Sequence, residues 1–182
     1  MPKYWLLSLM FVALLLAALS GAAQTPAPDP AAELQKLDVS TGRWIFHGQT
    51  MSARSGQPGT FTWNEDCAWS PNHMFLECTF DNDWAGRTAH SLVVDTYNSN
   101  DHNFWHYEMF SVGERGDHPF VSRMTIDGNT WVEYGPPNAS GQTTERITYN
   151  WTPPDRVAVT IETSKDGTTW TTVDKGEGIK QH

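Results

Sequence analysis

Hydrophobic and polar residues alternate along most of the chain, and the alternation is clearest between Thr60 and Phe80. A period of two residues is typical of a β-strand with one buried face. Ser70-Pro71-Asn72-His73 separates the two alternating runs with turn residues, so we predict a β-hairpin. The positions that share its apolar face are Phe61, Trp63, Glu65, Cys67 and Trp69 in the first run and Met74, Leu76, Cys78 and Phe80 in the second.

The same sequence of strand, turn and strand continues to the end of the chain. Turns such as Asp127-Gly128-Asn129 are typical of paired strands. After a first strand that begins at Gly42, strands are predicted at 60–69, 74–80, 87–97, 103–111, 120–126, 130–134, 143–151, 156–164 and 169–180. A short helix is predicted over Ala31–Leu37, where Leu34 and Leu37 form a small apolar stripe.

About ten sequential strands with short connections predict an antiparallel meander, and the predicted fold class is all-β. Closing the meander into an up-and-down barrel hides both edge strands. A barrel of about ten strands is wider than side chains alone can fill, so we expect a cavity inside it. A two-sheet sandwich is the alternative, but the sequence has no long crossover connection to support it.

The first 23 residues predict export. Lys3 precedes an apolar run from Tyr4 to Leu19, and Ser20-Gly21-Ala22-Ala23 offers small residues for cleavage. An uncleaved membrane anchor is the alternative. We therefore divide the chain into a signal peptide (1–23), a linker rich in Pro and Ala (24–32) and one domain (33–182), and predict a periplasmic or secreted protein.

The charge balance narrows the choice of partners. Loss of Lys3 with the signal peptide leaves 11 basic and 21 acidic residues, a net charge of −10. The chain has no basic patch and no run of arginines, which argues against nucleic acid and anionic lipid surfaces as partners. After cleavage of the signal we expect no stable insertion into a membrane.

Cys67 and Cys78 are the only two cysteines. Folding the hairpin about Asn72 and His73 sets them opposite each other, at a distance that a disulfide closes in a non-hydrogen-bonded pair. Disulfides persist in exported proteins, so we predict a Cys67–Cys78 bond. A buried pair of free thiols is the alternative.

Four segments of the chain resemble motifs of a bacterial family of unknown function. They are Leu34-Gln35-Lys36-Leu37-Asp38, Gly42-Arg43-Trp44, Glu65-Asp66-Cys67-Ala68-Trp69 and Ser164-Lys165-Asp166-Gly167-Thr168-Thr169-Trp170. In that family an L-x-x-L-D helix precedes a G-x-W first strand, and an S-x-D-G-x-x-W turn opens the last strand. The resemblance covers most of the domain and implies a lipocalin-like barrel, related in shape to fatty-acid-binding proteins and nitrobindin. The chain departs from the family at Asp95-Thr96-Tyr97-Asn98, where a Gly-Tyr-Asp turn is common.

Glu65 is the one charged residue on the apolar face of the hairpin. A buried carboxylate needs a hydrogen-bonding partner or takes up a proton. One interpretation is an ion pair with an arginine such as Arg123 or Arg146. The other is a polar anchor for a ligand in an aromatic cavity, with Trp63 and Trp69 supplying apolar area. If this end of the hairpin lies at a rim, Glu65 reaches water instead.

His90, His106 and Glu108 are the candidates for acid–base or metal chemistry. A turn of three residues after Asn98 puts all three on one face, whereas a turn of two or four residues puts His90 on the other face. Two histidines and a carboxylate resemble ligands of iron or zinc. The sequence lacks His-x-His and His-Glu-x-x-His spacing, so we predict no metal. A haem ligand by analogy with nitrobindin would rest on fold alone, so we predict no cofactor.

Three functions fit these features. The first is a barrel that binds a small apolar or aromatic molecule through Trp63, Glu65, Trp69, His90, His106 and Glu108. The second is an isomerase, cyclase or hydratase in the same cavity, with His and Glu as acid and base. The third is a carbohydrate-binding module with exposed tryptophans on a sheet face. We favour the first and expect Trp44 to fill the closed end of the barrel.

Overall fold

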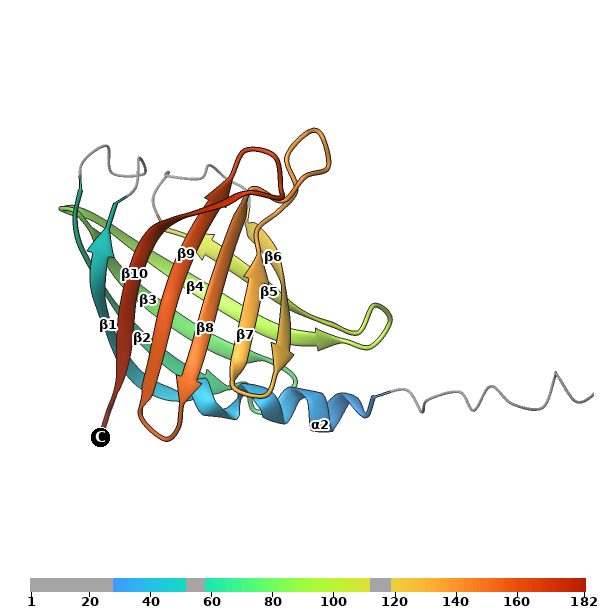
Figure 1. Cartoon of the computed structure of the whole chain (residues 1–182). Coiled ribbons are helices and arrows are strands. Elements are labelled where there is room, and N and C mark those ends of the chain that lie inside the picture. The colour runs from blue at the N-terminus through green and yellow to red at the C-terminus, as the bar shows by residue number, and fades with distance from the viewer. Residues whose placement is uncertain (1–27, 52–57, 112–118) are drawn as a thin grey trace, which may run out of the picture.

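The computed structural model describes residues 28–51, 58–111 and 119–182, in which ten antiparallel strands close into a barrel (Figure 1). The predicted fold class is confirmed. Each strand pairs with its neighbours in sequence, and β10 returns to pair with β1. The strands are β1 (Gly42–Thr50), β2 (Gly59–Trp69), β3 (Leu76–Trp84), β4 (Arg87–Asn98), β5 (Asn103–Phe110), β6 (Phe120–Asp127), β7 (Thr130–Tyr134), β8 (Glu145–Thr152), β9 (Arg156–Ser164) and β10 (Trp170–Gln181).

A short helical segment closes one end of the barrel (Figure 1). It consists of α2 (Pro30–Leu34) and the 3₁₀ helix η1 (Gln35–Ser40). Its first three residues, Pro30 to Ala32, lie inside the stretch predicted as linker. The predicted signal peptide lies outside the described residues. Among the described residues, no helix is both long enough and apolar enough to cross a membrane.

This helical segment, Pro30 to Ser40, is called the plug below, and both apolar and polar contacts hold it in place. Leu34 and Leu37 are buried in the core. The Trp44 indole N–H donates a hydrogen bond to the Ser40 carbonyl oxygen at 2.9 Å, which links β1 to the end of η1. Trp44 itself is 1% exposed, so it fills the closed end as the sequence predicts.

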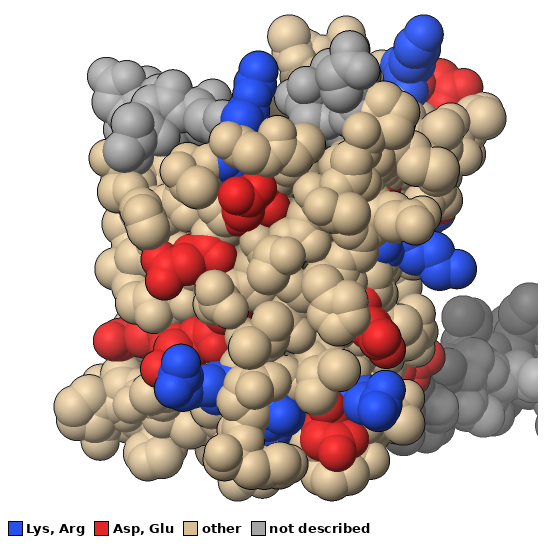
Figure 2. Space-filling model, turned by 90° about the vertical axis from the view of Figure 1, so that its left-hand side faces the viewer, with Lys and Arg blue, Asp and Glu red and all other residues tan. Residues whose placement is uncertain are grey.

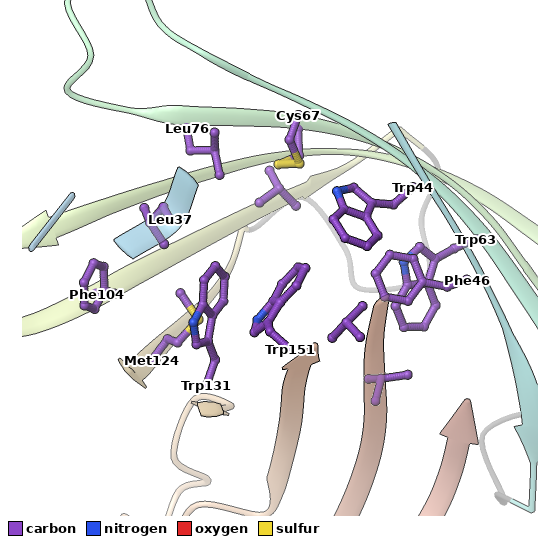
Figure 3. Packing of buried hydrophobic residues seen from close by; sticks show 14 of the residues in the cluster. Leu37, Trp44, Phe46, Trp63, Cys67, Leu76, Phe104, Met124, Trp131 and Trp151 are labelled. Carbon is purple, nitrogen blue, oxygen red and sulfur yellow. A yellow bond between two sulfur atoms is a disulfide. The ribbon is translucent and has the colours of Figure 1, made fainter. Parts of the chain in front are cut away.

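Large side chains fill the half of the barrel next to the plug. In the view of Figure 3, Leu37 lies among buried strand residues that include Leu76, Phe104 and Trp131. The Trp151 ring lies 5.2 Å from that of Trp44 and 4.9 Å from that of Trp131, centroid to centroid. Buried tryptophan rings contribute large apolar areas, so this half is a packed core.

Three glycines let aromatic rings lie against the backbone where β1 meets β10. A Cβ atom at Gly178 would lie 2.4 Å from Phe46 Cε1, and one at Gly176 would lie 2.6 Å from Phe61 Cζ. A Cβ atom at Gly48 of β1 would lie 2.5 Å from Phe61 Cζ. Any larger residue at these positions would displace the rings.

The turn after β2 is longer than predicted. Its ends are joined by a hydrogen bond from the Ser70 N–H to the Phe75 carbonyl at 2.8 Å, and the Ser70 and Asn72 side chains bond to each other. Met74 therefore lies in the turn and is 49% exposed, so its predicted place on the inner face is wrong. At its other end β3 runs on to Trp84, four residues beyond the predicted end at Phe80.

The S-x-D-G-x-x-W motif forms the turn before β10. The Asp166 carboxylate accepts hydrogen bonds from the N–H groups of Thr169 and Thr168 at 2.7 and 2.8 Å, which lower the pKa of Asp166 well below its ordinary value. Gly167 has a φ of +73°, a conformation that favours glycine. The motif is thus explained by turn geometry.

The outer surface mixes charges of both signs. On the face shown in Figure 2, acidic and basic side chains are interspersed and form no continuous basic patch. Arg146 pairs with Glu162 at 2.7 Å and lies 4.4 Å over the Trp170 ring. Both side chains of this pair are partly buried, and Arg146 also packs on the Trp170 ring.

The predicted disulfide is present. Cys67 pairs with Cys78 in the register of β2 and β3, with a Cα–Cα distance of 4.1 Å. The pair lies in the packed half of the barrel, where both residues are buried. The bond therefore ties the two strands together at the edge of the core.

Replacing Cys67 and Cys78 together by alanine should lower the free energy of unfolding by about 2–3 kcal/mol, because the unfolded chain loses a loop constraint. Urea unfolding of the oxidised protein and the double variant measures the difference. Alkylation of the oxidised, denatured protein provides the control, since it should modify neither cysteine. Two modified cysteines would show that the pair is a pair of free thiols.

Candidate ligand-binding site

A cavity of about 310 Å³ occupies the half of the barrel away from the plug. This volume is at the small end of the range for small-molecule pockets. Several lining residues come from strand ends opposite the plug, such as Trp84 at the end of β3 and Phe110 at the end of β5. The lining residues are Trp63, Phe80, Asn82, Trp84, Arg87, Ala89, His106, Glu108, Phe110, Phe120, Glu133, Glu145, Ile147, Tyr149 and Ile161.

One wall of the cavity is a stack of aromatic rings. Trp63 and Trp84 line the cavity, and their rings and that of the buried Phe61 lie within 16° of parallel, with centroids 4.7–5.3 Å apart. Trp84 Nε1 and Asn82 Oδ1 are buried without a hydrogen-bond partner among the described residues. Ring stacking, and not hydrogen bonding, therefore holds this wall in place.

The other walls combine aliphatic side chains with a charged mouth. Ile147 of β8 and Ile161 of β9 provide apolar surface. Arg87 and Glu145, at the first residues of β4 and β8, add one charge of each sign. A bound molecule would therefore meet apolar surface on two sides.

The floor of the cavity is a chain of buried polar residues. His106 Nδ1 lies 2.8 Å from Asp95 Oδ1, and His106 Nε2 lies 3.9 Å from Glu133 Oε1. The Ser122 hydroxyl donates to the same Glu133 oxygen at 2.6 Å. All four residues are at most 8% exposed. The inward positions of β4, β5, β6 and β7 thus meet in one network.

His106 carries a positive charge in this network. Burial by itself lowers the pKa of an imidazole, but Glu133 and Asp95 outweigh it and raise the pKa of His106 to about 10. The Nδ1–H group then donates a hydrogen bond to Asp95, and the Nε2–H group faces Glu133 as an ion pair at 3.9 Å. His106 therefore has no free lone pair with which to accept a proton.

Two further groups near the floor are neutral. Burial, together with the Asp95 carboxylate, raises the pKa of Glu65 to about 8, so Glu65 is mostly protonated at pH 7. Burial and the nearby Glu133 raise the pKa of the Tyr149 hydroxyl well above 10. Both groups therefore retain a proton inside the barrel.

Three of the predicted ligand residues line the cavity: Trp63, His106 and Glu108. The Glu108 carboxylate also accepts a hydrogen bond from Ser91 at 2.7 Å. Glu65 lies deeper, where its Oε1 atom is 3.0 Å from Cys67 Sγ. It therefore lies between the cavity and the disulfide.

Two predicted ligand residues lie away from the cavity. His90 is on the outer face, with a side chain 67% exposed and paired with Asp81. The turn between β4 and β5 has four residues, because Asn98 pairs with Asn103, and this length sends His90 to the face opposite His106. Trp69 lies at the plug end, where its indole N–H donates to Asp38 at 2.7 Å.

The suggested arginine partners of Glu65 are also elsewhere. Arg123 lies over the outward-facing Trp105 ring at 5.0 Å, and Arg146 pairs with Glu162. Among the described residues, an ion pair of Glu65 with Arg123 or Arg146 is therefore contradicted. Glu65 avoids a buried negative charge by retaining its proton, with no need of a cationic partner.

Sequence reasoning missed several residues of the site, namely Asn82, Trp84, Asp95, Glu133 and Tyr149. The alternation on β3 continues through Asn82 to Trp84 and could have placed both on the inner face. Asp95 fell within the predicted strand at 87–97, but its polar character hid its inward position. For Asp95, alternation alone left the inward face of the strand open until its pairing with His106 was known.

The described residues contain one group with the spacing of a metal site, formed by Glu65, Cys67 and Cys78. Its ligand atoms lie within 4.8 Å of one another. Both sulfur atoms are in the disulfide, however, and a metal is bound by the thiolate form of cysteine. The oxidised protein does not offer this group as a metal site.

Comparisons with known proteins support the fold. No protein-family model and no curated protein matches the chain. Among solved structures, the chain is similar to the crystal structure of Rv2717c from M. tuberculosis, with a TM-score of 0.57 and 13% sequence identity. The match covers 85% of this chain and 99% of that chain. At this identity the likeness concerns the barrel alone, and membership of the lipocalin-like family stays a prediction.

Replacing His106 by Gln should lower the free energy of unfolding by about 3–5 kcal/mol at pH 7, because Asp95 and Glu133 would be buried without a counter-charge. Urea unfolding measures the change. The matched control is His90→Gln, which breaks an exposed pair and should cost less than about 1 kcal/mol. Equal effects at the two positions would contradict the buried network.

Replacing Glu65 by Gln should flatten the pH dependence of stability between about pH 4.5 and 8. Because the folded pKa, about 8, exceeds the ordinary value of 4.5, the folded state holds the proton more tightly and loses stability as the pH rises through this interval. The variant has no such proton to lose. Melting should be similar at pH 5, and above it the variant should gain up to about 1.4 kcal/mol per pH unit over the parent. Parallel pH profiles would show that Glu65 titrates normally.

Proposed function

We propose that this protein binds a small, largely apolar or aromatic molecule inside the barrel. The observation that carries the proposal is the cavity of about 310 Å³ beside a stack of aromatic rings. Cavities with mostly apolar walls and a few convergent polar groups are typical of ligand sites. Trp63 would supply apolar contact, and the floor with His106 and Glu108 would supply polar contacts.

The enzyme alternative has weaker support. A general base needs a free lone pair and a pKa near the working pH. His106 has neither, because both of its nitrogens face carboxylates and its pKa is raised to about 10. The arrangement favours binding over acid–base catalysis by this histidine.

The carbohydrate-binding alternative is also less well supported. The exposed large hydrophobic residues on the described part of the chain include no tryptophan. Trp105, on the outer face, is half-buried, and Arg123 lies over its ring at 5.0 Å. A platform for stacking sugars needs open ring faces.

We further propose that the protein is exported to the periplasm or beyond the cell. The apolar N-terminal run with its cleavage-like residues supports export, and the Cys67–Cys78 disulfide is in keeping with an oxidising compartment. The ligand would then be a molecule present outside the cytoplasm.

Binding can be tested with N-phenyl-1-naphthylamine, a neutral fluorophore whose emission rises in apolar surroundings. The dye should bind one molecule per barrel and quench tryptophan emission. Replacing Ala89, which lines the cavity, by Trp should weaken binding at least about tenfold because the indole fills the space.

The matched control is Ala158→Trp, on the exposed face of β9. This variant adds the same side chain outside the barrel and should bind the dye like the parent. Equal binding by the two variants would place the dye outside the cavity. No binding by the parent would contradict the proposed function.

A further inference from the structure

Several polar side chains that line the cavity are already bonded to neighbouring protein groups. The Glu133 carboxylate accepts a hydrogen bond from the Ser122 hydroxyl at 2.6 Å, and the Glu108 carboxylate accepts one from the Ser91 hydroxyl at 2.7 Å. The His106 Nδ1–H group donates to a carboxylate at 2.8 Å. A ligand that bonds to such a group competes with a bond that the protein already makes, so it gains little.

The Tyr149 hydroxyl is different. Tyr149 lines the cavity from β8, and no hydrogen bond joins its hydroxyl to another residue in the part of the chain that the structure describes. Trp63 Nε1 and Trp84 Nε1 also lack partners among the described residues, but the surrounding atoms cover both nitrogens completely. The Tyr149 oxygen is not covered in this way, so it is the polar atom that a molecule in the cavity can reach.

The place of Tyr149 along β8 puts this hydroxyl at the floor. Trp151, two residues further along the same face, is buried in the core, with its ring 6.5 Å from that of Tyr149. Ile147, two residues in the other direction, lines the cavity. A molecule that enters from the mouth would therefore meet the Tyr149 hydroxyl with its leading end.

The hydroxyl is a neutral hydrogen-bond donor. Burial is the largest cause of its raised pKa, and the nearby Glu133 carboxylate adds to it. Burial disfavours a charge of either sign on a bound molecule as well. A carbonyl oxygen accepts a hydrogen bond and has no proton of its own, so it satisfies this donor without bringing a second donor that needs a partner.

We propose that the ligand of this cavity is an uncharged aromatic molecule with a carbonyl oxygen, which accepts a hydrogen bond from the Tyr149 hydroxyl at the floor. The aromatic body would lie beside Trp63 and Trp84, which line the cavity from β2 and β3. This inference rests on the proposed binding function and adds the class of the ligand and its orientation.

The test compares two probes of the same shape that differ in one atom group. Benzophenone has a C=O group where 1,1-diphenylethylene has C=CH₂. Each probe is titrated against bound N-phenyl-1-naphthylamine, on the parent protein and on Tyr149→Phe. The substitution removes only the donor, so it should reduce the preference for the ketone over the alkene about fivefold. Displacement by the alkene should change little.

A matched control and a second measurement locate the bond. Tyr134→Phe removes the same group from the exposed face of β7 and should leave the preference unchanged. In the infrared spectrum, the carbonyl stretch of benzophenone bound to the parent should lie at lower frequency than in cyclohexane, because a hydrogen bond weakens the C=O bond. Tyr149→Phe should move this band back toward its position in cyclohexane. Thermal melts show whether each variant is folded, and the spectrum of the parent tests the bond without any variant.

The outcomes separate this inference from the proposed function. An equal preference in the parent and Tyr149→Phe would overturn the inference while dye binding upholds the cavity. A carbonyl band that matches the one in cyclohexane, or a failure of both probes to displace the dye, would do the same. Absence of dye binding by the parent would instead overturn the proposed function itself.

Discussion

Pairing of β1 with β10 closes the ring of ten strands, and this closure fixes the width of the interior. The two strands pair from Arg43 with Gln181 to Thr50 with Asp174. A ring of this size is too wide for side chains to fill along its whole length. Glycines on both strands bring Phe46 and Phe61 close to the backbone at the join. Aromatic residues then fill the half next to the plug, and the cavity is what remains.

The polar floor lies where the packed half ends. Below it, Trp44, Trp131 and Trp151 form an apolar core, and above it the cavity opens. Buried charges are costly unless they are paired, which the imidazolium between Asp95 and Glu133 achieves in part. Glu65 meets the same constraint by retaining its proton. The charged groups at the centre of the barrel are thus tolerated because groups of opposite charge lie beside them.

Alternation along the chain was enough to predict the ten strands, because each has one face against the interior. The disulfide followed from the same pattern, since folding the hairpin about Asn72 and His73 sets Cys67 opposite Cys78. The side of the sheet on which His90 lies depends on a turn length, and a change of one residue reverses it. Alternation alone does not supply that length.

The candidate site was predictable only in part, for a related reason. Trp63 and His106 lie in the cavity, but Trp69, on the same face of β2 as Trp63, lies at the plug end. Position along the barrel axis depends on strand tilt and on where the plug enters, and neither is visible in alternation. Asp95 lies opposite His106 only because the turn between β4 and β5 has four residues, and Glu133 reaches His106 from β7, two strands away, so alternation alone brings neither of them to His106.

The position of the chain ends has a consequence for how the protein can be attached. The plug precedes β1 at one end of the barrel, and β10 finishes at the same end, where Gln181 pairs with Arg43 (Figure 1). A tether, fusion partner or solid support joined to either end of the domain would therefore lie on the side away from the mouth. Immobilised in this way, the barrel would present its opening outward, toward the surrounding solution.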